Sequence, residues 1–136
     1  MLRNFFRFGF LPTSADCALL LLRLWAGIAL FWRHGLEKAT HYSMMSQHFP
    51  NPIGIGSHLS LVLSMFAETV CALLLVLGLG TRFAALVIII DLGVAFSLVH
   101  HFAFHGPMSG ELPFLYLGCA LAIFLAGPGR YSADRS

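Results

Sequence analysis

Four apolar stretches dominate the chain and predict helices that cross a membrane. A bilayer crossing needs about 17 to 25 mostly apolar residues in a helix, because hydrocarbon offers backbone amides no hydrogen-bond partner. The fourth stretch is the shortest; Glu111 and Pro113 are in its first turn and the turn Gly127-Pro128-Gly129 closes it. The predicted spans are residues 15–32, 59–79, 83–104 and 111–126. This pattern predicts an all-α protein, a membrane four-helix bundle.

The composition supports a membrane protein. Hydrophobic residues make up 58% of the 136 residues and charged residues 10%, with a mean hydropathy of +0.82. Soluble domains are closer to half apolar and a quarter charged. The length fits a single domain over residues 1–136. A net charge of only +2 argues against a nucleic-acid partner, since such proteins usually carry a basic face.

The distribution of basic residues predicts the orientation. If both termini are cytoplasmic, five arginines outside the spans lie inside and only Arg33 and Lys38 lie outside, as the positive-inside rule requires. We interpret residues 1–12 as an uncleaved interfacial anchor. The five inner arginines are Arg3, Arg7, Arg82, Arg130 and Arg135. The same topology places all seven histidines on the outer side: His34, His41, His48, His58, His100, His101 and His105.

Three ionisable residues, Arg23, Glu68 and Asp91, fall near the middle of predicted spans. Such groups are costly in hydrocarbon unless they face the bundle interior and find partners, so we expect the three to meet in an intramembrane polar core. Ser60, Ser64 and Glu68 recur every fourth residue and predict one polar stripe on the second span. The cluster is either a folding clamp between Arg23 and Glu68 or a site for a proton or ligand, because two acids face one arginine.

A second face of the third span suggests an oligomer. Gly93, Ser97 and His101 form a stripe roughly opposite Asp91, so one of the two faces is available to a second subunit. This pattern makes a homo-oligomer a candidate assembly.

The first outer loop, residues 34–58, is longer than a bundle connection needs. Its segment FPNPIGIG holds two prolines and two glycines and is not expected to be a continuous helix, which leaves open whether the loop re-enters the interface. The outer histidines and methionines are of a type that binds copper or zinc. Their spacing matches no metal motif, so no metal site is assigned. Cys17, Cys71 and Cys119 are interpreted as packing residues.

Several positions together resemble the DoxX family, a group of small four-span bacterial membrane proteins. The resemblance covers roughly residues 17 to 134. It rests on Arg23, on the segment HGLEK with His34, Gly35 and Lys38, on Glu68, on LGLGTRFAAL with Gly78, Thr81, Arg82 and Ala85, on Glu111, and on GPGRYSAD with Gly127, Pro128, Gly129, Ser132 and Asp134.

The resemblance implies a location and a role. Such proteins resemble the quinone-reducing subunits of thiosulfate:quinone oxidoreductase, which implies a bacterial inner-membrane subunit of a redox complex, with quinone as candidate cofactor and membrane or periplasmic redox proteins as partners. On this interpretation His34, Lys38, Glu111 and His101 line an outer pocket. A quinone carbonyl there would accept a hydrogen bond from His34 or Lys38, and Glu111 would exchange the proton.

Other functions stay open at this stage. The chain has no outer cysteine for a sulfur substrate and no recognisable large periplasmic domain, so the sequence leaves open whether it is an enzyme by itself. One alternative is a metal-handling or small-molecule transport protein that uses the outer histidines and the midplane charges. Another is a membrane scaffold without catalysis.

Overall fold

The computed structural model describes residues 2–11 and 14–134, and every regular element in those ranges is helical. Some neighbouring elements run on as single continuous helices. The elements are α1 (Leu2–Phe6), α2 (Ala15–Leu30), η1 (Phe31–Gly35), α3 (Leu36–Thr40), α4 (Tyr42–Met45), α5 (Ser57–Phe66), η2 (Ala67–Cys71), α6 (Ala72–Leu77), α7 (Thr81–Val94), η3 (Ala95–Val99) and α8 (Glu111–Ala126). The three η elements are π-helical turns.

Three continuous helices are long and apolar enough to cross a membrane. They are α2–η1–α3 with 26 residues, α5–η2–α6 with 21 and α7–η3 with 19. The bounds of α8 agree with the predicted 111–126, but its 16 residues make it shorter than the other three. An all-helical membrane architecture therefore agrees with the sequence, and a fourth crossing by α8 stays a prediction.

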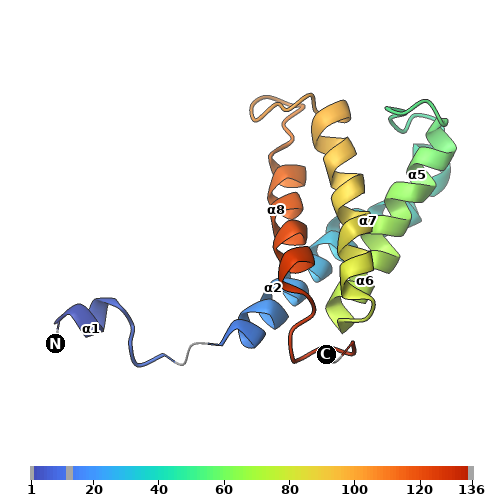
Figure 1. Cartoon of the computed structure of the whole chain (residues 1–136). Helices are drawn as coiled ribbons and strands as arrows, with labels where there is room; N and C mark the ends of the chain where they lie inside the picture. Colours follow the sequence, from blue (N-terminus) through green and yellow to red (C-terminus); the bar gives the residue numbers. More distant parts are fainter. Residues whose placement is uncertain (1, 12–13, 135–136) are drawn as a thin grey trace.

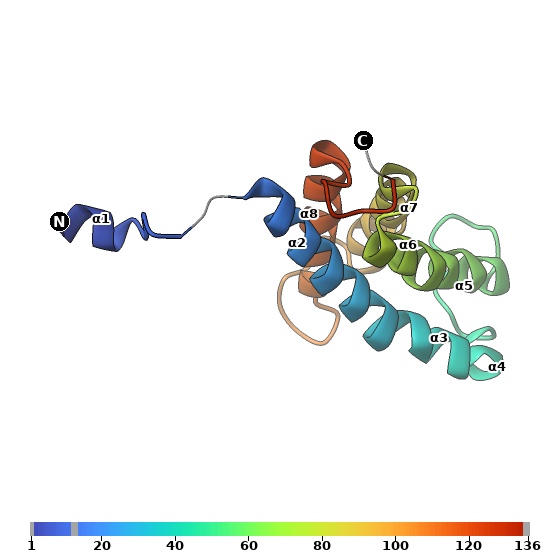
Figure 2. The same ribbon diagram turned by 90° about the horizontal axis from the view of Figure 1, so that it is seen from below.

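The helices pack around a small core (Figure 1). α7 and α8 lie side by side, while α2–η1–α3 crosses the others obliquely and packs on α6 and α8 (Figures 1 and 2). Alanines and branched aliphatic residues fill the contacts. The fully buried members include Leu30, Leu75, Ala84, Ala85, Ile88 and Ile123.

The first helix continues to Thr40, eight residues past the predicted end of the span. The sequence HGLEK was expected to begin the outer loop, but it continues the helix, and His34 and Lys38 have partners in the bundle. Gly35 permits this close packing, because a Cβ there would lie 2.7 Å from Thr69 Cγ2 and would press on the backbone of Glu68. Because the backbone of the first helix contacts that of the second at Gly35, Lys38, one turn further along the first helix, lies next to Glu68.

The third helix ends at Val99, not at the predicted residue 104. His101 and Phe102 adopt left-handed backbone conformations with φ of 50° and 59°, which a continuing helix excludes. The apolar residues that extended the prediction belong to an aromatic cluster. Phe96 contacts Phe102, Phe104 and Phe114, with ring centroids 5.3 to 5.4 Å apart. The packing of these phenylalanines against one another therefore stabilises the chain more than a longer third helix would.

The C-terminal segment folds back onto the end of the bundle where α6 meets α7. We call this arrangement the C-terminal clasp and define it by Arg23, Gly78, Thr81, Tyr131 and Asp134. Arg23 is fully buried and donates a hydrogen bond from Nη2 to the carbonyl of Tyr131. The Asp134 carboxylate accepts the backbone N–H groups of Gly80 and Thr81, at 2.7 and 2.8 Å, and so caps the N-terminus of α7. Gly78 has a φ of +70° at the end of α6.

The turn between α6 and α7 and the C-terminal segment lie together at one end of the long helices, the end that holds the clasp (Figure 1). The two long connections, between α3 and α5 and between η3 and α8, lie at the opposite end and carry five of the seven histidines. His58 lies in the first turn of α5, and His34 lies in η1, nearer that end of its helix. Which end faces the cytoplasm stays a prediction, and Arg135, which entered it, lies outside the described residues.

Candidate ligand pocket

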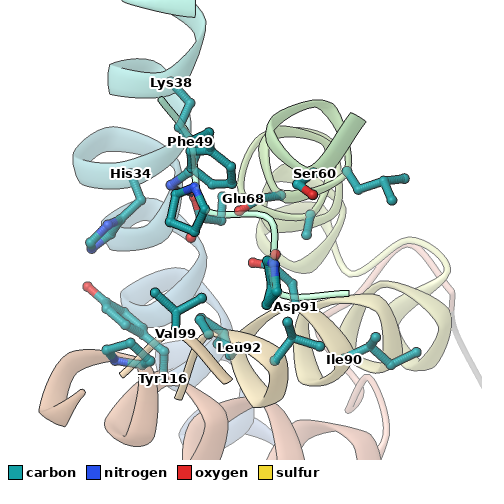
Figure 3. Close-up of a pocket in the computed structure, with 18 of the residues that line it drawn as sticks. His34, Lys38, Phe49, Ser60, Glu68, Ile90, Asp91, Leu92, Val99 and Tyr116 are labelled. Atoms are coloured by element: carbon teal, nitrogen blue, oxygen red, sulfur yellow. Dashed lines mark hydrogen bonds and ion pairs between the residues drawn. The ribbon is translucent and has the colours of Figure 1, made fainter. Parts of the chain in front are cut away.

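A pocket of about 620 Å³ opens between the helices in the half of the molecule opposite the clasp. Its wall is mostly apolar and is contributed by α2 to α3, α5 to η2, α7 to η3, α8 and the loop before α5. Polar side chains from four helices reach into it (Figure 3). They include His34, Lys38, Glu68, Asp91 and Tyr116.

An ion pair between Lys38 and Glu68 forms the charged end of this pocket. Lys38 Nζ donates to Glu68 Oε2, and the two side chains are only 12% and 8% exposed. Each charge of this buried pair needs the other, because removing either partner would leave an unpaired charge away from solvent. Lys38 also lies 6.0 Å from the centre of the Phe49 ring. The pocket therefore offers an ammonium group and a carboxylate side by side.

An aromatic edge borders the ion pair. His34 and Tyr116 meet edge to face with ring centroids 5.7 Å apart, His34 from η1 and Tyr116 from α8. An imidazole and a phenol each carry one polar group and one flat apolar ring, so both can contact a planar ligand and hydrogen-bond to it. Figure 3 shows them on the same side of the pocket, across from Asp91.

Asp91 and Ser60 bring further polar atoms to the wall opposite His34. Asp91 is half-buried on α7, and no ion pair to it occurs within the described residues. Ser60 is 9% exposed, and its hydroxyl has no hydrogen-bond partner among the described residues although it lines the pocket. Buried polar atoms are usually hydrogen-bonded, so an unused hydroxyl facing a cavity points to an external partner.

The three π-helical turns all border this pocket. η1 carries His34, η2 carries Glu68, and η3 contributes Ala95 and Val99. A π-helical turn widens the helix by one residue and loosens the regular hydrogen-bond ladder, and such turns are frequent at functional sites. Their meeting at one cavity marks it as the specialised part of the bundle.

An apolar loop covers the pocket on the side of the long connections. Residues 49–55 contribute Phe49, Pro50, Pro52, Ile53 and Ile55 to the lining. The loop is fixed where Asn51 Oδ1 accepts the N–H of Gly56 at 2.9 Å. The FPNPIGIG segment is thus not a helix, as expected, and it packs over the cavity. Re-entry into the membrane stays a prediction.

The expectation that Arg23 would join Glu68 and Asp91 in one polar core was wrong. Arg23 and Glu68 do not pair, because Arg23 belongs to the C-terminal clasp and Glu68 pairs with Lys38. Arg23 sits too early in its helix, about four turns before Lys38, to share a level with Glu68. Glu68 and Asp91 do line one cavity, and so does the polar stripe of Ser60, Ser64 and Glu68.

The proposed outer set is only partly brought together. His34 and Lys38 line the pocket, whereas Glu111 and His101 do not. Both are exposed: Glu111 lies in the first turn of α8 and His101 follows the end of η3. Their place in the set came from the family resemblance, which does not fix where their side chains lie.

Several lining residues were missed by the sequence interpretation. Tyr116, Phe49 and His100 were not singled out for this site, although each lines it. His100 is held by a hydrogen bond between Nδ1 and the carbonyl of Met108, at 2.9 Å. Besides His34 and Lys38, the polar stripe of Ser60, Ser64 and Glu68 was a sequence signal that pointed to this site.

No group of three or more His, Cys, Asp or Glu side chains is placed to hold a metal ion in residues 2–11 and 14–134. Some of the outer histidines have other contacts: His58, in the first turn of α5, hydrogen-bonds to the hydroxyl of Tyr42 at 2.7 Å, and His100 to the carbonyl of Met108.

These features define a class: a helical membrane protein that crosses the bilayer several times. Its helices enclose a mostly apolar pocket, which has polar side chains in its wall and is covered by a loop. The sequence profile of DoxX matches residues 18–101, so the chain belongs to the DoxX family. It is similar to an uncharacterized protein from Haemophilus influenzae, with 28% identity over 127 residues, 89% of this chain and 83% of that one. No solved structure matches this chain.

Proposed function

We propose that this protein is the membrane subunit of a redox complex and that its pocket binds a quinone-type ligand. The observation that supports this most is the combination of an apolar cavity with donors and carboxylates in its wall, Lys38 beside Glu68 and His34 beside Tyr116. Ligand sites are mostly apolar with a few polar groups that fix orientation.

The residues present fit such a ligand. A quinone is a flat apolar ring with oxygens at its edge, so it needs aromatic or aliphatic walls and a few hydrogen-bond donors. Lys38 and His34 supply donors, Phe49 and Tyr116 supply rings, and the hydroxyl of Ser60 is unused within the described residues. When bound, a quinone supplies reversible transfer of two electrons together with two protons.

The side chains of the pocket would bind the ligand and handle those protons. Lys38 Nζ, already oriented by Glu68, donates a hydrogen bond to an oxygen of the ligand. The carboxylates of Glu68 and Asp91, together with the imidazoles of His34 and His100, are groups in the wall that would exchange those protons. They replace Glu111 in this role, because Glu111 lies outside the pocket. The loop of residues 49–55 limits the access of water.

The setting that we infer is the inner membrane of a bacterium with both termini cytoplasmic. Arg3 and Arg7 precede the first long helix, Arg82 is in the first turn of α7 and Arg130 follows α8, whereas Arg33 and Lys38 lie in η1 and α3, toward the long connections. Partner redox proteins would then dock on the outer loops or on a face of the bundle. On this proposal, such a partner supplies the electrons.

The test is binding of a tail-less benzoquinone, labelled with tritium, to the purified chain in lipid nanodiscs. The wild type should bind it saturably, and His34→Ala should weaken binding about tenfold, the value of one lost hydrogen bond of about 1.4 kcal/mol. Glu111→Gln serves as the matched control and should bind like the wild type. Equal binding by wild type and His34→Ala, or no saturable binding by the wild type, would overturn the proposal.

A further inference from the structure

Between α5 and α7 the pocket is lined by exposed side chains of the membrane-spanning stretches, so it opens sideways there. α7 packs against η2 and α6, but above η2 the helices α5 and α7 diverge (Figure 1). The pocket extends into this divergence, because Leu63, Phe66, Ile90 and Val94 belong to its lining. We call this opening the side cleft and define it by those four residues.

The rim of the side cleft is apolar and faces outward. Ile90 is 59% exposed, Leu63 50% and Phe66 39%, and all three lie in helices that are long and apolar enough to cross the membrane. In a bilayer these side chains contact lipid tails. The other approach to the pocket, from the long connections, is covered by the apolar loop of residues 49–55.

The inner end of the side cleft is polar. Asp91 lies next to Ile90 on α7 and faces the pocket, and Ser60 and Ser64 line it from α5 (Figure 3). A carboxyl and an unused hydroxyl at this depth would be costly against hydrocarbon alone. A bound molecule with a polar head at Asp91 and Ser60 and an apolar tail toward Leu63 and Ile90 would cover both ends.

We propose that the pocket is loaded from within the bilayer through the side cleft, and that its ligand is a membrane-dissolved amphiphile whose long apolar tail lies between α5 and α7. This deepens the proposed function and rests on it. It assigns the tail of the ligand a site of its own and makes Leu63, Phe66 and Ile90 determinants of specificity for tailed ligands.

The experiment compares two ligands with the same benzoquinone head, one with a ten-carbon tail and one with a methyl group in its place. Both are measured by equilibrium binding to the full chain in nanodiscs. Ile90→Trp fills the side cleft and should weaken binding of the tailed ligand about tenfold, a typical cost of steric overpacking. Binding of the methyl analogue should change less than about twofold.

Leu86→Trp is the matched control, because Leu86 is an exposed α7 residue outside the pocket lining. It should leave binding of both ligands unchanged. Leu63→Trp closes the cleft from α5 and should reproduce the effect of Ile90→Trp. Agreement between the two variants shows that the effect does not come from misfolding of one of them.

The outcomes separate this inference from the proposed function. If the wild type binds both ligands and Ile90→Trp weakens both equally or neither, the side cleft is not the tail site. If Ile90→Trp dissociates a dimer of this chain and spares tailed binding, a second copy fills the cleft and the inference is wrong. If the wild type binds neither ligand, the proposed function itself fails.

Discussion

The C-terminal clasp and the pocket both contain buried charge, but they use it differently. In the clasp, Asp134 accepts two backbone N–H groups and Arg23 donates to a backbone carbonyl. In the pocket, Lys38 and Glu68 pair side chain to side chain beside a cavity of about 620 Å³, with the hydroxyl of Ser60 unused within the described residues. Arg23 does not line this cavity.

This difference separates stability from binding. Polar groups that close on the backbone fix how the chain ends fold, since a lost partner leaves a buried backbone group unpaired. Polar groups that border a cavity remain available to a ligand. We therefore expect substitutions in the clasp to lower stability without a specific effect on binding, and substitutions in the pocket to affect binding even where stability is restored.

The largest effect is expected from Lys38→Met, which leaves the carboxylate of Glu68 buried without its partner. Breaking a buried pair costs about 3 kcal/mol or more of unfolding free energy. The double variant Lys38→Met/Glu68→Met should return to within about 1 kcal/mol of the wild type, because both charges are gone. Binding of the tail-less quinone should stay at least about tenfold weaker in both variants.

Unfolding in mixed micelles with increasing SDS measures the stability of these variants. A double variant that binds the quinone like the wild type would show that the ion pair only supports the fold.

Gly78→Ala should have the next largest effect, and it acts on the clasp. Alanine at a φ of +70° is strained, and its Cβ would press on the guanidinium of Arg23 and lie 2.5 Å from Ser132 Cβ. We expect a loss of about 3 kcal/mol in the same SDS titration. Gly80→Ala is the matched control: its φ is +56°, but nothing lies within 4 Å of the added Cβ, so about 1 kcal/mol is expected.

Similar losses of stability for Gly78→Ala and Gly80→Ala would show that close packing of Gly78 against Arg23 and Ser132 does not stabilise the clasp. The folded fraction of each variant should still bind the tail-less quinone with wild-type affinity.

Asp134→Asn tests the electrostatic part of the clasp and should cost less. The backbone N–H of Thr81 lowers the pKa of Asp134 against a smaller opposing effect of burial, and the N–H of Gly80 and the charge of Arg23 lower it further. The ionised form therefore stabilises the fold above the unfolded pKa of about 3.9, and this contribution disappears as the pH falls through the lower folded pKa. Because Asp134 is exposed, we expect less than about 1 kcal/mol.

The melting temperature of the wild type should thus fall as the pH is lowered below about 4, and Asp134→Asn should lose part of that dependence. An identical pH dependence in both proteins would show that Asp134 contributes nothing by its charge.

The smallest effect is expected from His101→Ala, because this exposed residue lies outside both the clasp and the pocket. Binding of the tail-less quinone should remain within about twofold of the wild type. A His101→Ala variant with tenfold weaker binding would extend the functional site to the connection between η3 and α8.

Much of the helical architecture could be predicted from hydropathy, because three long apolar stretches leave few other solutions in a membrane. The ends were harder to predict. A charged segment such as HGLEK resembles a loop until its partner is known, and the phenylalanines after Val99 resemble a helix until their aromatic contacts are known. Both depend on tertiary contacts between residues far apart in the sequence.

The site was predicted in part for the same reason. Helical periodicity placed Ser60, Ser64 and Glu68 on one face, and the structure confirms that they line one cavity. Periodicity fixes the face of a helix but not its level against its neighbours, so it could not tell that Lys38, and not Arg23, meets Glu68. π-helical turns shift that register further, and hydropathy does not reveal them.

Photolabelling tests the central claim most directly. A benzoquinone that carries an azide is bound to the wild type in nanodiscs and activated by light, and the labelled peptides are identified by mass spectrometry. The account predicts labels on the peptides that contain Phe49 and Tyr116, and their loss when excess unlabelled quinone competes. Labels confined to the exposed face with Trp25 and Trp32, or labels that competition does not reduce, would contradict it.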